Sequence, residues 1–349
     1  MNRACLIIFI PLFFVLSCHS DKANNQPINK TWVKVPDNWI SRALHFKYGK
    51  VDTTLLHEFA NFIKPDTLNN PKTEHVDPNY GLIFNCIAVD LDGDQQDELV
   101  CLVGWDVYDP YLGVLKQING AWYLIYKEEI YTFYNSPTIY VANNYSGKKT
   151  FYLNRVYDHG SGVYINGSSF YKLDNNQVYK CLDIINDAHI YGWGLYMNQA
   201  VKTSFEFSGD DKDELTVDYT YNFFPGAVKE GDCPWCANEE IPLVKGDDNV
   251  YYQWDNKQHK YKLDIPKYKS GSDDLTEKKI ACFGDFGNDT LFVDAFRDQI
   301  NETLKTGTAQ QKKILKKYLA LVKRDKIAKT GNLIKTTEAG GTSFYGVDK

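Results

Sequence analysis

The amino-acid sequence predicts a mainly β protein, built from repeated β-meander or propeller-like units, with an N-terminal helix and a C-terminal helical segment. Three observations favour this class. Aromatic residues make up 15% of the 349-residue chain, and 25 of them are tyrosines, which suit pleated strands. Turn dipeptides such as Asn119-Gly120 separate aromatic-rich runs. Similar stretches also recur at intervals of about 57 residues, which is typical of stacked supersecondary units.

The N-terminus has the pattern of an export signal. Arg3 precedes an apolar run, Leu6 to Leu16, that is short for a membrane span but suits a signal peptide. The run ends Val15-Leu16-Ser17-Cys18, which resembles the lipobox of bacterial lipoproteins. The resemblance implies that residues 1–17 are a signal peptide and that Cys18 carries the lipid. An ordinary secretory signal is the alternative.

Lipidation of Cys18 would place the protein in the bacterial cell envelope, anchored to a membrane and facing the periplasm or the cell exterior. Several acyl chains on one cysteine hold a protein firmly, because each buried CH₂ contributes about 0.8 kcal/mol. Residues 18–50 are expected to form a tether and an N-terminal segment. A helix should follow over Asp52–Ile63, since Asp52 can cap it and its apolar residues fall on one stripe.

A β-rich repeat domain is expected over residues 51–268. Its hairpin turns fall at Asn119-Gly120, Asn175-Asn176 and near Asn256-Lys257. The second interval is longer than the first because residues 225–249, rich in Pro, Gly and charge, are expected to be an insertion. With this insertion removed, the sequence indicates three successive units, each too small to bury its own apolar face.

The densest cluster of oxygen donors lies between two apolar runs at residues 90–98. The carboxylates of the run alternate in a way that a tight loop can turn inward, and the carbonyl of Gln96 can add another oxygen. Calcium prefers six to eight such hard ligands. We therefore expect a structural calcium ion, Ca²⁺, bound by Asp90, Asp92, Asp94, Gln96 and Glu98.

The loop and the period resemble the FG-GAP or VCBS-type repeats of integrin-like β-propellers, where such a loop binds calcium between two strands of each blade. The resemblance implies the same five ligand positions here, although Gln95 replaces the usual glycine and Glu98 the usual aspartate. The third unit keeps Glu206 and Glu214 at matching positions but has lost other carboxylates. Three units are fewer than a closed propeller of about four to eight blades needs, so a partial or two-sheet arrangement is an alternative.

The C-terminal part is expected to be helical over residues 269–330, with helices at Leu291–Leu304 and Ala309–Ala328, and residues 331–349 should form a flexible tail. Thr308 is placed to cap the second helix. Its lysines give Thr308–Thr330 a charge of +7, while the whole chain carries −6. The acidic balance of the rest of the chain argues against nucleic acid as a partner.

Eight cysteines are present, and six remain beyond the signal and the anchor. Cys86 and Cys101 bracket the acidic loop and could be bridged across it, or could be buried thiols. Cys233 and Cys236 form a CxxC pair in a polar stretch that is poor helix material. A local structural disulfide is therefore favoured over a redox active site, which needs this pair at a helix N-terminus.

These patterns favour a lipid-anchored binding protein that recognises an unknown protein or glycan, with a structural calcium loop and no catalytic residues that the sequence identifies. The alternatives are an exported enzyme, either a hydrolase or a thiol–disulfide protein using Cys233 and Cys236, and a lipoprotein that inhibits a toxin. No motif separates these classes by itself.

Overall fold

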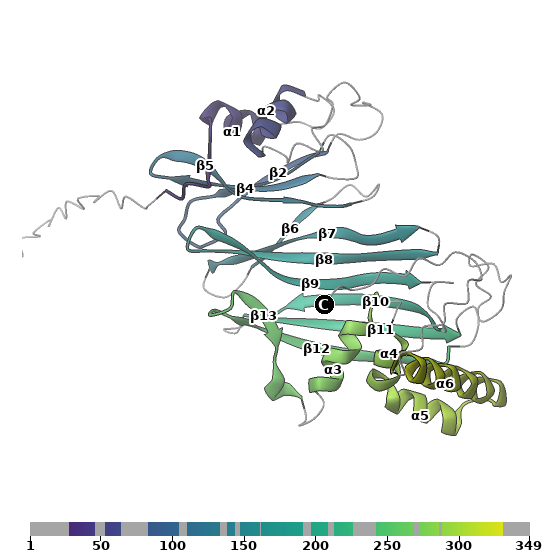
Figure 1. Ribbon diagram of the computed structural model, residues 1–349. Coiled ribbons are helices and arrows are strands. Elements are labelled where there is room, and N and C mark those ends of the chain that lie inside the picture. The colour runs from purple at the N-terminus through teal and green to yellow at the C-terminus, as the bar shows by residue number, and fades with distance from the viewer. Residues whose placement is uncertain are drawn as a thin grey trace, which may run out of the picture.

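The structure is a computed structural model of the whole chain. It describes residues 28–45, 53–63, 83–104, 110–132, 138–143, 147–160, 162–190, 197–208, 213–225, 242–268, 273–285 and 288–330. Two antiparallel sheets form the body of the molecule, with helices at both ends (Figure 1). Among the described helices, none is both long and apolar enough to cross a membrane.

The first sheet has five strands in the order β1-β5-β4-β3-β2. Their bounds are β1 Val33–Val35, β2 Ile83–Val89, β3 Glu98–Gly104, β4 Tyr111–Ile118 and β5 Ala121–Glu129. Two helices, α1 (Asp37–Leu44) and α2 (Thr53–Ile63), cover one face of this sheet. The helix expected over Asp52–Ile63 is thus confirmed over its described residues, and its apolar stripe is buried at Leu55, Leu56, Phe59 and Ile63.

The second sheet is an eight-stranded meander in which β6 to β13 follow one another in sequence order. The strands are β6 Ile139–Asn143, β7 Lys149–Gly160, β8 Val163–Asp174, β9 Gln177–Ile190, β10 Met197–Phe207, β11 Glu214–Pro225, β12 Val244–Asp255 and β13 Lys260–Leu263. Strand β12 starts inside the range 225–249 that we expected to be an insertion, and residues 226–241 lie outside the described part of the chain.

The strands divide into three consecutive four-stranded meanders, β2–β5, β6–β9 and β10–β13. In the first two meanders, the third and fourth strands are joined at Asn119-Gly120 and Asn175-Asn176, and all four turn residues have positive φ. This geometry belongs to the two-residue hairpin turn that Asn and Gly favour. These two predicted turns therefore lie at equivalent places in successive units. The third predicted turn, near Asn256-Lys257, also joins a third strand to a fourth, but it spans four residues between Asp255 and Lys260.

The meanders do not close into a propeller within the described part of the chain. Strand β9 pairs directly with β10, so the second and third units share one continuous sheet, while the first unit belongs to a separate sheet. The two-sheet alternative thus describes the molecule. The sheets pack through a core that includes Val100 and Leu102 on β3 and Phe151 and Leu153 on β7.

The C-terminal helices cover the far part of the second sheet (Figure 1). They are α3 Asp273–Cys282, α4 Asp289–Ala295, α5 Arg297–Thr306 and α6 Ala309–Thr330, after a short 3₁₀ turn η4 at Ile265–Lys267. The single helix expected over Leu291–Leu304 is divided at Phe296, whose fully buried ring packs on Tyr221 and Phe223.

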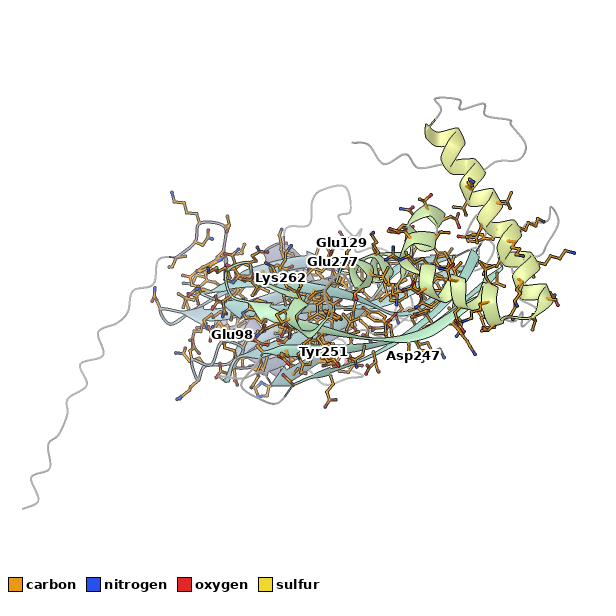
Figure 2. The ribbon with its side chains drawn as sticks, turned by 90° about the horizontal axis from the view of Figure 1, so that it is seen from below. Glu98, Glu129, Asp247, Tyr251, Lys262 and Glu277 are labelled. Carbon is orange, nitrogen blue, oxygen red and sulfur yellow. The ribbon has the colours of Figure 1, made fainter. Side chains whose placement is uncertain are left out.

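Helix α6 begins as the sequence predicts. The backbone amide of Gln311 donates to the Thr308 hydroxyl at 3.2 Å, and the Gln311 side chain accepts from the Thr308 amide at 2.8 Å. This reciprocal capping box satisfies two amides that the first turn leaves without helical partners. Seen from below, α6 lies at the end of the molecule opposite Glu98 (Figure 2).

Candidate functional site

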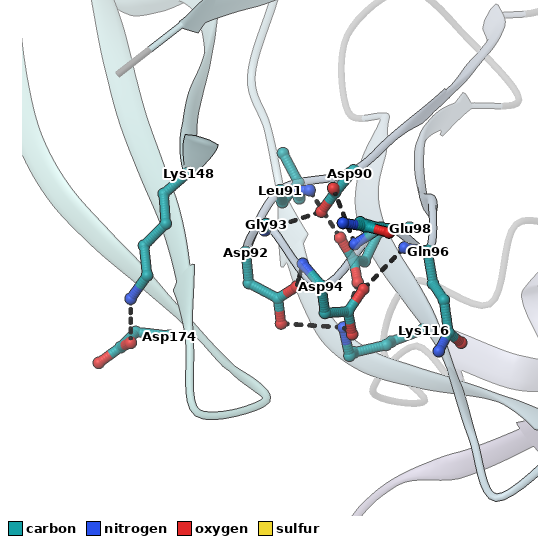
Figure 3. Close-up of polar contacts among 11 residues, drawn as sticks. Asp90, Leu91, Asp92, Gly93, Asp94, Gln96, Glu98, Lys116, Lys148 and Asp174 are labelled. Atoms are coloured by element: carbon teal, nitrogen blue, oxygen red, sulfur yellow. Dashed lines mark hydrogen bonds and ion pairs between the residues drawn. The ribbon is translucent and has the colours of Figure 1, made fainter. Parts of the chain in front are cut away.

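The acidic loop connects β2 to β3 and folds around its first carboxylate (Figure 3). Asp90 accepts hydrogen bonds from the backbone amides of Gly93 at 2.8 Å and Gln95 at 3.0 Å. Gly93 and Gln95 both have positive φ, 81° and 68°. A glycine adopts this backbone without cost, so Gln95, which has a side chain, carries backbone strain in this loop.

The loop also joins the two sheets. Leu91 is fully buried in the core between them, and its carbonyl accepts a hydrogen bond from the amide of Lys149 at the start of β7, at 2.9 Å. Close by, Lys148 forms an ion pair with Asp174 at 2.8 Å (Figure 3). The conformation of the loop is therefore coupled to the packing of the first unit on the second.

A lysine lies at the centre of the carboxylates. Lys116 on β4 lies one residue beyond the Leu99–Leu115 pair, beside Glu98 at the start of β3. Its ammonium is 2.9 Å from a carboxylate oxygen of Asp92, 2.9 Å from one of Asp94, and also in contact with Glu98 (Figure 3). We call Lys116, Asp92, Asp94 and Glu98 the Lys116 site. The sequence does not identify Lys116 and Glu98 as a pair, because 17 residues separate them and only strand register brings them together.

The electrostatics of the Lys116 site follow from its burial. The Glu98 side chain is 0% exposed. Burial raises the pKa of Glu98 to about 7, although the ammonium of Lys116 and the amide of Leu91 oppose this. Burial by itself lowers the pKa of Lys116, but its hydrogen bonds to Glu98, Asp92 and Asp94 outweigh that effect and raise the pKa above its ordinary value.

The donor chemistry of the loop suits a hard dication, since one oxygen each from Asp90, Asp92 and Glu98 lies within 4.8 Å of the others. Three of the predicted ligands already bind the Lys116 ammonium, however. Gln96, the predicted carbonyl ligand, donates its backbone amide to Asp94 at 2.8 Å. A calcium ion would fit this loop only if the ammonium gave up part of its contacts, and the calcium site stays a prediction.

The second unit has a lysine at the equivalent position. Lys172 precedes Asn175 by three residues, as Lys116 precedes Asn119, and it pairs across the sheet with Thr150 of β7. Its ammonium contacts Asp213 and lies 4.2 Å from the ring centre of Trp254 and 5.1 Å from that of Tyr261. We call Lys172, Asp213, Trp254 and Tyr261 the Lys172 site. Burial lowers the pKa of Lys172, and Asp213 offsets this only in part.

The third unit keeps the carboxylate but not the lysine. Glu214 opens β11 as Glu98 opens β3, and it pairs with Gln253 rather than with a lysine. Lys267 neutralises Glu214 from η4 instead, at 2.8 Å. The match between Glu98 and Glu214 that the sequence suggests is thus a match of strand position, while residues 209–212 of this loop lie outside the described residues.

A polar network that the sequence does not reveal lies between β5 of the first sheet and β7 to β9 of the second. We call it the rim network; its members are Tyr126, Glu128, Arg155, Tyr157, Ser169, Tyr171, Lys180 and Asp183. Glu128 accepts from Tyr126 at 2.7 Å, Tyr171 at 2.9 Å and Arg155 at 3.0 Å. No sequence pattern could have found it, because its members come from four strands.

The cysteine predictions divide in two. Cys18, Cys233 and Cys236 lie outside the described residues, so lipidation and the CxxC disulfide stay predictions. Cys86 and Cys101 are register partners across β2 and β3, and both are thiols in this structure. Cys181 and Cys282 are also buried thiols.

Comparison with known proteins finds no matching family model, no similar curated protein and no similar solved structure.

Proposed function

We propose that this protein is a lipid-anchored binding protein of the bacterial cell envelope, in which the repeated meanders form a rigid platform for a protein or glycan partner. The observation that carries the proposal is the repeat itself. Three four-stranded meanders, the first two with equivalent two-residue turns, join into two packed sheets, and helices cover the sheets at both ends of the molecule. Repeat folds of this kind build extended surfaces from many strands, and such surfaces serve binding.

The acidic loop supports a structural rather than a catalytic role for the best motif in the chain. Its buried carboxylate, Glu98, is held by the Lys116 ammonium and by the amide of Leu91 at 2.8 Å. Leu91 also anchors the loop in the core between the sheets. Under this proposal, calcium would be a structural ion with ligands from Asp90, Asp92, Asp94, Gln96 and Glu98. It would replace the Lys116 ammonium as the partner of the carboxylates.

Binding to the envelope can be tested directly. The chain from residue 18 onward, with Cys18→Ser so that no lipid is attached, is sedimented with envelopes isolated from the producing cell. We expect saturable binding, and its sensitivity to treatment of the envelopes identifies the partner class. Loss after protease indicates a protein, and loss after periodate, which cleaves vicinal diols, indicates a glycan. No saturable binding would contradict the binding role.

The anchor is tested separately with the full chain. The unmodified chain should fractionate with membranes, and Cys18→Ala should abolish this, because the lipid is then the only attachment proposed. Unchanged membrane association of Cys18→Ala would contradict lipidation at this residue.

A further inference from the structure

The rim network has the composition of a ligand site as well as of an intersheet contact. Asp183 accepts from Tyr157 at 2.8 Å and from Ser169, and Lys180 binds Asp183 at 3.0 Å. Lys180 also lies 3.6 Å from Glu128, so one ammonium connects the two carboxylates. The outer members reach solvent: 43% of the Asp183 side chain and 36% of Tyr157 are exposed.

Three β-bulges shape this region. The register of β7 with β8 shifts at Tyr157, and that of β8 with β9 shifts at Cys181 and at Asn186. A bulge inserts one unpaired residue and turns the neighbouring side chains in new directions, and bulges are frequent beside functional sites. In a regular sheet, successive side chains of a strand point to opposite faces. The bulges change this alternation, and Tyr157, Lys180 and Asp183 meet in one place.

Tyr157 lies over a bare stretch of backbone. A Cβ on Gly167 would come within 2.3 Å of the Tyr157 ring and 2.2 Å of the Ile184 carbonyl, so only glycine allows the ring to lie there. The guanidinium of Arg155 lies 5.4 Å from the centre of the same ring. Tyr157 is therefore a fixed aromatic ring between the Gly167 backbone and the Arg155 guanidinium, and its exposed third is the part against which a flat apolar face can pack.

The charges and hydrogen-bonding groups define the ligand class. The two carboxylates, Glu128 and Asp183, are balanced by Arg155 and Lys180, so the site favours neither an anion nor a cation. Among the described residues, the hydrogen bond of the Arg155 guanidinium runs from Nη1 to Glu128, which leaves the Nη2 group to donate to a ligand. Spare guanidinium donors, partly exposed carboxylate acceptors and a tyrosine ring match a neutral ligand with many hydroxyl groups.

We infer that the rim network is a binding site for a neutral carbohydrate, with Tyr157 stacking on a sugar ring and Arg155, Lys180 and Asp183 bonding its hydroxyls. This inference rests on the proposed binding function and assigns that function to one place on the molecule. It favours the glycan over the protein as partner.

The test uses an array of immobilised hexasaccharides, five neutral (cello-, laminari-, malto-, manno- and xylohexaose) and two acidic (from heparin and polygalacturonate). The chain from residue 18 with Cys18→Ser should bind at least one neutral sugar more tightly than both acidic ones. Arg155→Met and Tyr157→Ala should each weaken that binding about tenfold or more, which corresponds to the loss of one good contact.

Two variants serve as matched controls. Arg42→Met removes a similar ion pair, Arg42–Glu58 at 2.9 Å, between α1 and α2, and Tyr140→Ala removes a tyrosine of similar exposure, 40%, on β6. Both should bind within about twofold of the parent, while circular dichroism checks that every variant folds. Asp183→Asn, which keeps the shape of the site, provides a second test should Arg155→Met unfold.

Binding of no neutral sugar, or of acidic sugars only, would overturn the inference. The inference would also be overturned if Asp183→Asn and Tyr157→Ala bound the neutral sugar as tightly as the parent does. The proposed function fails separately, by absence of saturable binding to envelopes. Binding to envelopes that protease abolishes and periodate spares would keep the proposed function and reject the carbohydrate.

Discussion

Lys116 and Lys172 occupy the same position in successive units, each three residues before the asparagine that begins the hairpin turn, and both are nearly buried. Their surroundings differ. Lys116 is held by three carboxylates of its own unit, whereas Lys172 lies among two aromatic rings and one carboxylate from the third unit. The first environment raises the lysine pKa and the second lowers it.

The difference shows that a repeat can keep a residue and change its role. In the first unit the lysine is the counter-ion of a turn that would otherwise gather several carboxylates around the buried Glu98. In the second unit the loop before β7 has no such carboxylates among its described residues, and Thr150 stands where the first unit has Glu98. Lys172 then connects units two and three through Asp213, because β12 and β13 bring their aromatic rings over it.

The largest expected effect comes from Lys116→Met. It leaves Glu98, which is 0% exposed, and two further carboxylates without their cation. Breaking a buried ion pair from one side costs about 3–5 kcal/mol of the free energy of unfolding. Guanidinium chloride unfolding at pH 8 measures it, and a loss under about 1 kcal/mol would contradict the central role of Lys116.

The pH dependence of stability should follow Glu98. Its pKa is raised from 4.5 to about 7, so the folded state binds this proton more tightly than the unfolded state. The contribution of Glu98 is therefore full below pH 4.5 and is lost as the pH rises through 7. It amounts to about 3 kcal/mol. Denaturant unfolding at several pH values across this range gives the free energy of unfolding as a function of pH. The decrease with rising pH should be steeper for the parent than for Glu98→Gln. Equal decreases would contradict a raised pKa for Glu98.

Addition of calcium tests whether the Lys116 ammonium and a metal ion compete for the carboxylates of the acidic loop. In the parent chain, where Lys116 neutralises the carboxylates, calcium should raise the melting temperature only slightly. In Lys116→Met it should recover about half of the lost stability, because a dication can then bind the grouped carboxylates of Asp90, Asp92 and Glu98. Thermal melts with calcium, magnesium and EDTA make the comparison, and Lys116→Met with Asp92→Ala is the control. No recovery would reject the calcium site.

Lys172→Met should have a much smaller effect than Lys116→Met. Its partner Asp213 is 23% exposed and also accepts from the Tyr261 hydroxyl at 2.8 Å, so the carboxylate keeps a donor and water. Methionine also packs well against Trp254 and Tyr261. We expect a loss of at most about 1 kcal/mol, because the remaining Asp213 carboxylate is hydrated and hydrogen-bonded, as in an ion pair that is open to solvent. A loss equal to that of Lys116→Met would show that both sites depend on charge.

Much of the local structure can be predicted from the sequence, because it depends on residues that are close together in the chain. Examples are the α2 helix, the turns at Asn119-Gly120 and Asn175-Asn176, the Thr308 cap, and the matching strand positions of Glu98 and Glu214. Helical periodicity, positive φ at asparagine and glycine, and capping hydrogen bonds act over a few residues, so sequence patterns report them directly. The acidic loop can likewise be recognised in the sequence as a cluster of carboxylates.

Only the tertiary structure decided what neutralises that cluster and how the units join. The contact between Lys116 and Glu98 depends on the register of β3 and β4, and the pairing of β9 with β10 makes one sheet of two units instead of separate blades. The break at Phe296 and the rim network depend on rings and charges that meet across different strands and helices. Such contacts join residues far apart in the chain, and their partners are set by packing and strand pairing, which no local pattern records.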